Sequence, residues 1–81
     1  MGTKTHPGRF DCYANAKPDE PMFVLLARDP SAAILVRLWA TMREAEIRQG
    51  RRPESDRLKV GEAYACATDM ERWHDENRGR R

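Results

Sequence analysis

The fold is decided by residues 29–50, which read DPSAAILVRLWATMREAEIRQG. Asp29 can cap a helix, and Pro30 fits its first turn, where the missing N–H costs nothing. No further Gly or Pro occurs before Gly50, a residue type that favours the left-handed conformation at a helix end. These signals predict one helix over residues 31–49.

The apolar residues of this helix cover more than one of its sides. One stripe has spacings of three, four and three residues: Leu35, Leu38, Met42 and Ala45. Other apolar side chains widen the surface beyond the stripe: Ile34, Val36, Trp39 and Ile47. A helix that is apolar on two sides must be covered on two sides. We expect a later helix to cover one side, and a short preceding helix or a second chain to cover the other.

A second long helix follows in the sequence. Pro53 blocks continuation of the first helix, and Ser55 is a suitable cap for the next. Residues 56–76 carry an apolar inner face: Val60, Ala63, Ala67 and Met70. Because Ala63 and Ala67 are small and one turn apart, a neighbouring helix can approach closely. The sequence therefore predicts an antiparallel helical hairpin with its tip at residues 50–55, followed by a frayed basic C-terminus over residues 78–81.

Two segments precede the hairpin. Residues 1–18 are polar, contain Pro7 and Gly8, and show no sustained period, which predicts a flexible N-terminal arm. An Asp-Glu-Pro triplet then opens the apolar run of residues 22–27, which favours a short helix of about two turns, with a buried strand as the rival interpretation. The predicted fold class is all-α: a short helix plus an antiparallel helical hairpin, in a helical domain over residues 19–77.

Composition restricts the class of protein. The chain has 81 residues, a charged fraction of 35% and a net charge of +2. No apolar run approaches the roughly 18–20 residues that span a bilayer, so no membrane contact is expected. Two cysteines and no secretory h-region predict a cytoplasmic protein with free thiols. A chain this short buries only about 60% of its unfolded surface, which favours a homo-oligomer. The expected dimer contacts are Leu35, Leu38, Trp39 and Met42.

No motif in the sequence indicates catalysis or a cofactor. His6, Cys12, Cys66 and His74 form a nominal zinc-binding set. However, eight residues separate Cys66 from His74, which is about 12 Å along a helix and too far for ligands of one ion. Patterns of nucleotide-binding loops, nucleophile elbows and zinc proteases do not occur. We expect neither enzymatic activity nor a bound metal.

Basic residues gather around the predicted hairpin tip: Arg48, Arg51, Arg52, Arg57 and Lys59. Such a cluster can contact phosphate. Acidic neighbours dilute it, and no aromatic residue is interleaved for base stacking. Ordinary solvated charge is the simpler interpretation, so direct nucleic-acid binding is an alternative that we do not favour.

Three stretches resemble a family of small proteins encoded by phages and prophages. They are FDCY at residues 10–13, AKPDEPMFVLLARDP at residues 16–30, and the pieces LVRLWA and REA within residues 35–45. The likeness covers roughly residues 10–74, and proteins of this type include anti-CRISPR proteins. The resemblance implies an anti-CRISPR protein that binds a CRISPR–Cas effector complex of the host cell, such as a type I Cascade. It carries over no catalytic or ligand residue.

The implied mechanism is obstruction, in which the inhibitor blocks target DNA binding or nuclease recruitment. A net charge of +2 argues against mimicry of DNA. Aromatic and arginine side chains dominate the energetics of protein interfaces. On that basis the predicted partner-binding residues are Phe10, Tyr13, Arg37, Arg43, Arg48, Arg51, Arg52 and Arg57. For Trp39 and Phe23, core packing is the simpler interpretation.

Two alternative functions belong to other classes. A helical oligomer could act as a sponge that sequesters a cyclic signalling nucleotide, because guanidinium groups suit phosphate. Its phosphate contacts would be Arg48, Arg51, Arg52 and Arg57. The other alternative is a small phage DNA-binding regulatory module.

Overall fold

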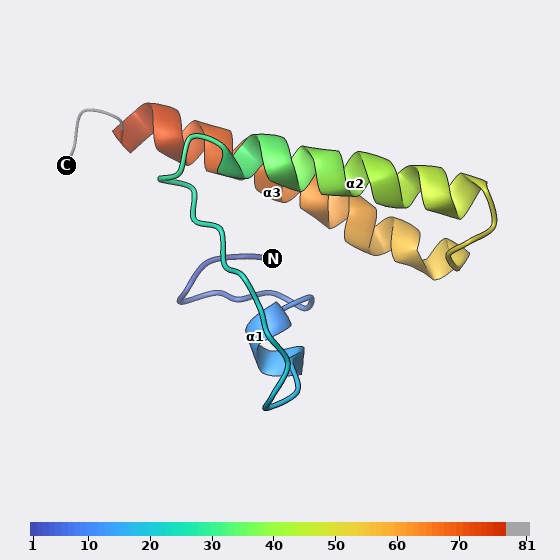
Figure 1. Ribbon diagram of the computed structural model, residues 1–81. Helices are drawn as coiled ribbons and strands as arrows, with labels where there is room; N and C mark the ends of the chain where they lie inside the picture. Colours follow the sequence, from blue (N-terminus) through green and yellow to red (C-terminus); the bar gives the residue numbers. More distant parts are fainter. Residues whose placement is uncertain (78–81) are drawn as a thin grey trace.

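The computed structural model describes residues 1–77, and over this range the chain contains helices and no strand. The long helices α2 (Ala32–Arg48) and α3 (Arg57–Asn77) lie side by side and run antiparallel (Figure 1). A short α1 (Cys12–Asn15) lies in the N-terminal part, and a 3-10 turn, η1 (Glu54–Asp56), leads into α3. The predicted cap Ser55 lies inside this turn instead, and α3 begins at Arg57. The predicted all-α helical hairpin is confirmed.

The ends of α2 follow the local chemistry of the sequence. Before the helix, the Asp29 carboxylate accepts a hydrogen bond of 2.9 Å from the backbone N–H of Ser31. After it, Gly50 adopts φ +76° and donates its N–H to the carbonyl of Ile47. A glycine in the left-handed conformation ends a helix at little cost and lets the chain reverse. The N-cap of α2 is therefore Ser31 and not the predicted Asp29, which lies in the preceding turn, whereas Gly50 ends the helix as predicted.

Small side chains make the contact between α2 and α3. The buried residues are Ala32, Ala33, Ala40, Ile47, Val60, Ala63 and Ala67. Five of these seven are alanines, so the two helices approach closely but enclose little apolar volume. Among the described residues no large side chain is fully buried. The hairpin therefore has a thin core, to which Met1, Val36 and Tyr64 add partly buried contacts.

The stripe with spacings of three, four and three residues is not the side of α2 that α3 covers. Ala33, Ala40 and Ile47, seven residues apart, are buried in the hairpin. Leu38 and Met42 keep 54% and 60% of their surface exposed. Alanines at the crossing allow a closer approach than leucines would, so the small residues face α3 and the large ones remain outside. Of the two covers expected for this helix, the described residues supply the later helix, α3.

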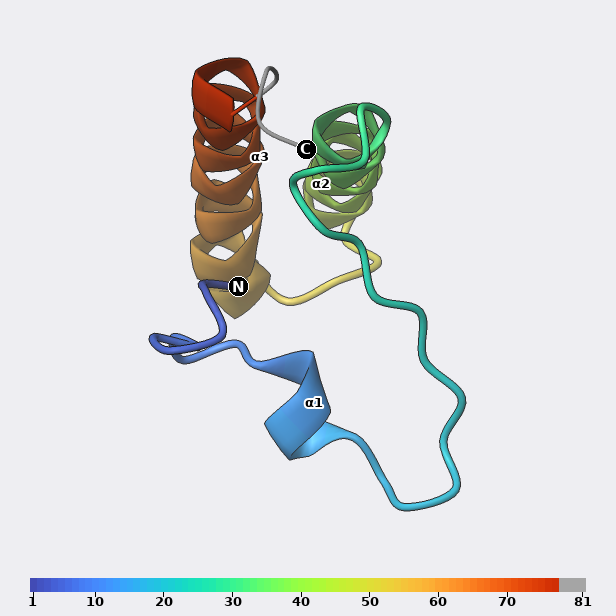
Figure 2. The same ribbon diagram turned by 90° about the vertical axis from the view of Figure 1, so that its left-hand side faces the viewer.

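The prediction of a short helix over residues 22–27 is wrong, because residues 22–26 form no regular secondary structure and Ala27 lies in a turn. A turn of helix forms earlier instead, at α1, where the Asp11 carboxylate accepts the N–H of Tyr13 at 3.2 Å. The apolar run contains Phe23 and Val24, which have low helix propensity. Six residues are also too few to sustain a helix. In Figure 2 this part of the chain runs as an open loop from α1 to the start of α2.

The first ten residues are held against α3 by specific contacts. The Met1 ammonium donates a hydrogen bond of 2.8 Å to the carbonyl of Phe10. Arg9 pairs with Glu62 of α3 at 2.7 Å, and the Lys59 ammonium lies 5.5 Å from the centre of the Phe10 ring. Flexibility of the arm stays a prediction. The predicted frayed C-terminus, residues 78–81, lies outside the described residues.

Candidate protein-binding surface

One side of α2 is apolar, exposed and uncharged. We call it the α2 outer face and define it by Ile34, Leu35, Leu38 and Met42, all of them exposed. At 3.6 residues per turn, four of the charged residues of α2 lie on its other sides, and Glu46, one turn after Met42, borders this face. Arg37 reaches across to Glu71 of α3, and Arg43 reaches Asp56 at the hairpin tip. No intramolecular partner covers the α2 outer face over residues 1–77.

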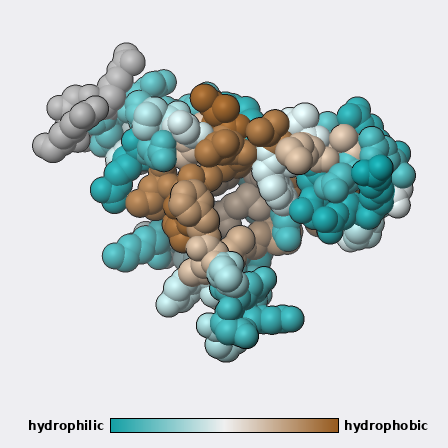
Figure 3. All heavy atoms as spheres, viewed as in Figure 1, coloured by the Kyte–Doolittle hydropathy of each residue, from teal (hydrophilic) through white to brown (hydrophobic). Residues whose placement is uncertain are grey.

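A second apolar surface lies on the irregular chain before α2. We call residues 22–26 the apolar segment; its exposed members are Met22, Phe23, Val24 and Leu26, with Phe23 86% exposed. Figure 3 shows apolar side chains gathered where this segment meets the first half of α2, whereas the hairpin tip is hydrophilic. A small protein that exposes this much contiguous apolar surface has the composition of an interaction site.

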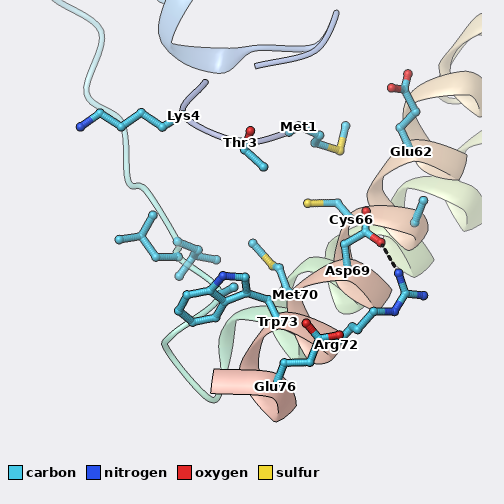
Figure 4. A pocket seen from close by; sticks show the side chains of 15 residues that line it. Met1, Thr3, Lys4, Glu62, Cys66, Asp69, Met70, Arg72, Trp73 and Glu76 are labelled. Carbon is cyan, nitrogen blue, oxygen red and sulfur yellow. Dashed lines mark hydrogen bonds and ion pairs between the residues drawn. The ribbon is translucent and has the colours of Figure 1, made fainter. Parts of the chain in front are cut away.

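A groove of about 570 Å³ separates the apolar segment from α3 (Figure 4). Its apolar lining comes from Met1, Leu25, Leu26, Met70 and Trp73. Cys66 also lines it, and burial raises the pKa of this thiol. A thiol with a raised pKa is a poor nucleophile, because the thiolate is the reactive form. The groove therefore offers apolar contact area rather than a reactive group.

Four of the six predicted arginines are engaged in ion pairs within the chain. The Arg37 guanidinium lies 2.6 Å from the Glu71 carboxylate, and that of Arg43 lies 3.7 Å from Asp56. Arg52 pairs with Glu46 at 3.8 Å, and Arg57 pairs with Glu54. Arg48 and Arg51 are exposed, and no ion pair of theirs occurs within residues 1–77. A phosphate at the tip would have to compete with these pairs, so the tip gives little support to the nucleotide sponge.

The predicted aromatic residues divide into two kinds. Tyr13 on α1 is exposed, as a residue that contacts a partner should be. Phe10 is half-buried between Arg9 and Lys59, so it serves the arm's own contact with α3. Trp39 lies at the edge of the α2 outer face, with the Arg43 guanidinium 5.0 Å from its ring.

The core interpretation of Phe23 is wrong, because this ring is almost fully exposed. Sequence reasoning treated the apolar segment as part of a helix with a buried side. Its position between Pro21 and Pro30 is the signal that could have indicated an isolated, uncovered segment.

The described part of the chain contains no cluster of metal-ligating side chains. Over residues 1–77, no three of the His, Cys, Asp and Glu side chains come close enough together to hold a metal ion. Cys12 is exposed and Cys66 half-buried, and both thiols are free. None of the described helices is long and apolar enough to cross a bilayer.

The ion pair between Arg37 and Glu71 predicts that the stability of the fold depends on pH, which can be tested. The hydrogen bond from Arg37 holds the pKa of the Glu71 carboxyl below its usual 4.5. A carboxyl whose pKa is lower in the folded chain stabilises the fold above its unfolded pKa, and this contribution is lost as the pH falls through its folded pKa. We expect Glu71→Gln to lower the Tm slightly at neutral pH, because the pair is exposed to solvent.

The difference in Tm between Glu71→Gln and the wild type should disappear as the pH falls below 4.5. Thermal unfolding followed by circular dichroism at neutral pH and at several acidic values measures it. A difference that persists unchanged in acid would contradict the role given to this ion pair.

Comparisons with known proteins were made at three levels: no family model, no curated protein and no solved structure matches the chain. The surfaces described above are therefore the basis for assigning a function.

Proposed function

We propose that the protein works by stoichiometric binding of another protein, and that the apolar segment is its main contact. The exposure of Phe23 carries this proposal. The ring is 86% exposed, and its contact with water is unfavourable in the isolated chain. A partner that covers the ring removes this contact and gains the corresponding free energy.

The surroundings of the apolar segment have the composition of an interface rim. Lys17, Asp19 and Glu20 precede it, and Arg28 and Asp29 follow it. Stable interfaces combine an apolar centre with a polar, solvent-accessible rim of this kind. The rim carries both signs of charge, which suits a protein partner better than a polyanion.

We further propose that the partner is a CRISPR–Cas effector complex in the cytoplasm of a bacterial host. The support for this identity is the resemblance of residues 10–74 to small phage-encoded anti-defence proteins. Bound there, the protein would act as an anti-CRISPR inhibitor that obstructs target DNA binding or nuclease recruitment. The mixed charge of its surface favours contact with a Cas subunit over occupation of a DNA channel.

A purified type I Cascade with its guide RNA tests this proposal. We expect the protein to co-elute with the complex and to reduce its binding to target DNA, or to leave DNA binding intact and prevent nuclease recruitment. Fluorescence anisotropy of labelled target DNA and a nuclease assay separate the two modes. Absence of co-elution, together with unchanged DNA binding and cleavage at saturating inhibitor, would refute the proposed target.

A further inference from the structure

We propose that the α2 outer face is covered by the same face of a second copy, so that the protein is an isologous dimer. This inference concerns a different surface from the apolar segment and does not depend on the proposed target. It rests on three observations: the amount of surface the chain exposes, the spacing of the side chains on this face, and the absence of charged residues at its seam positions.

The single chain exposes more surface than a folded monomer of its mass should. Scaling of accessible surface with mass gives about 5,000 Å² for 9.4 kDa, whereas the chain exposes 6719 Å². The excess is about 1,700 Å², and a stable interface removes about 800 Å² from each partner. Exposed surface is therefore sufficient for a dimer contact on α2 and for a separate contact through the apolar segment.

The side chains of the α2 outer face have the spacing of a helix–helix seam. Leu35, Leu38, Met42 and Ala45 alternate steps of three and four residues, as the seam positions of a coiled coil do. Ser31 and Gln49 continue these steps by four residues at each end. The seam thus extends over the whole length of α2, apolar in its middle and polar but uncharged at its ends.

The seam is self-complementary when two copies meet antiparallel. With the twofold axis midway between Leu38 and Met42, Leu38 of one copy faces Met42 of the other. Leu35 then faces Ala45, a large side chain against a small one, which keeps the two helices evenly spaced. Ser31 faces Gln49 at both ends, where solvent and hydrogen bonding are available. No charged residue occupies a position of the seam. Glu46 borders the seam, and its carboxylate pairs with Arg43 and Arg52 of its own chain.

Sedimentation equilibrium of the protein alone tests the dimer. We expect a mass of twice 9.4 kDa for the wild type. In Leu38→Glu each dimer would bury two unpaired carboxylates, so we expect the dissociation constant to rise at least about 100-fold. The matched control is Leu58→Glu, which makes the same change at a leucine of α3 that is 60% exposed, and which should remain a dimer.

Two further measurements keep the proposal testable if Leu38→Glu does not fold. Wild-type Tm should rise with protein concentration, because association stabilises the folded chain by mass action. In a background in which Cys12 and Cys66 are replaced by serine, Leu35→Cys combined with Ala45→Cys should form an intermolecular disulfide, and neither substitution alone should do so. A wild-type mass of 9.4 kDa with a Tm independent of concentration would overturn the dimer. Efficient cross-linking by Leu35→Cys alone would overturn the antiparallel arrangement.

Discussion

Replacing Ala63 by aspartate is expected to unfold the hairpin. Ala63 is 1% exposed and belongs to the cluster with Ala40, Ile47 and Val60 that joins α2 to α3. Burial of an unpaired carboxylate costs several kcal/mol, and the core of so small a domain supplies only about 3–5 kcal/mol. The cost therefore approaches or exceeds the whole stability of the fold.

Circular dichroism measures this outcome, as a loss of most of the helical signal at 25 °C. The control is Ala65→Asp, two residues further along α3, where the side chain is exposed and the same substitution should leave the helices intact. If both variants melt like the wild type, the packing of α2 against α3 described here is incorrect.

Replacing Phe23 by glutamate is expected to abolish binding of the protein partner while leaving the fold unchanged. The ring makes little contact within the chain, so removing it costs the folded state almost nothing. An aromatic anchor at the centre of an interface contributes about 2 kcal/mol or more, which corresponds to a loss of affinity of at least about 30-fold. The introduced carboxylate adds a desolvation cost.

Affinity for purified Cascade, measured by surface plasmon resonance, checks this prediction. Leu58→Glu serves as the control, because it introduces the same charge at another exposed apolar residue outside the apolar segment. We expect Phe23→Glu to keep the wild-type Tm and sedimentation behaviour. If Phe23→Glu retained full affinity while the wild type bound Cascade, the partner would contact a different surface.

The parts of the fold with strong local signals could be predicted from the sequence. Gly50 and Pro53 lie in the turn between the two long helices as predicted, and Asp29 lies in the turn before α2, two residues ahead of its N-cap, Ser31. The small size of Ala63 and Ala67 indicated close approach of the helices, and both residues are buried. Such signals depend only on residues within one or two helical turns of each other, so they can be interpreted from the sequence alone.

The path of the chain before α2 could not be predicted in the same way. Whether residues 22–27 form a helix depends on having a surface to pack on, and periodicity in six residues does not reveal one. The ion pairs between arginines and carboxylates could not be predicted from the sequence for a related reason. Arg37 and Glu71 are 34 residues apart, and only the antiparallel crossing of the helices brings them together. The candidate site therefore followed from exposure rather than from any sequence motif.

The contact between Arg9 and Glu62 has a consequence for the order of folding. These residues are 53 positions apart, whereas the chain between α2 and α3 is a short turn. Entropy opposes closure of a long loop more than that of a short one, and proteins with local contacts fold fastest. The hairpin should form first and the N-terminal arm should dock last, onto a finished helix. Undocking of the arm alone, the reverse of this last folding step, would open the side of the groove that Met1 lines. It would not melt either long helix.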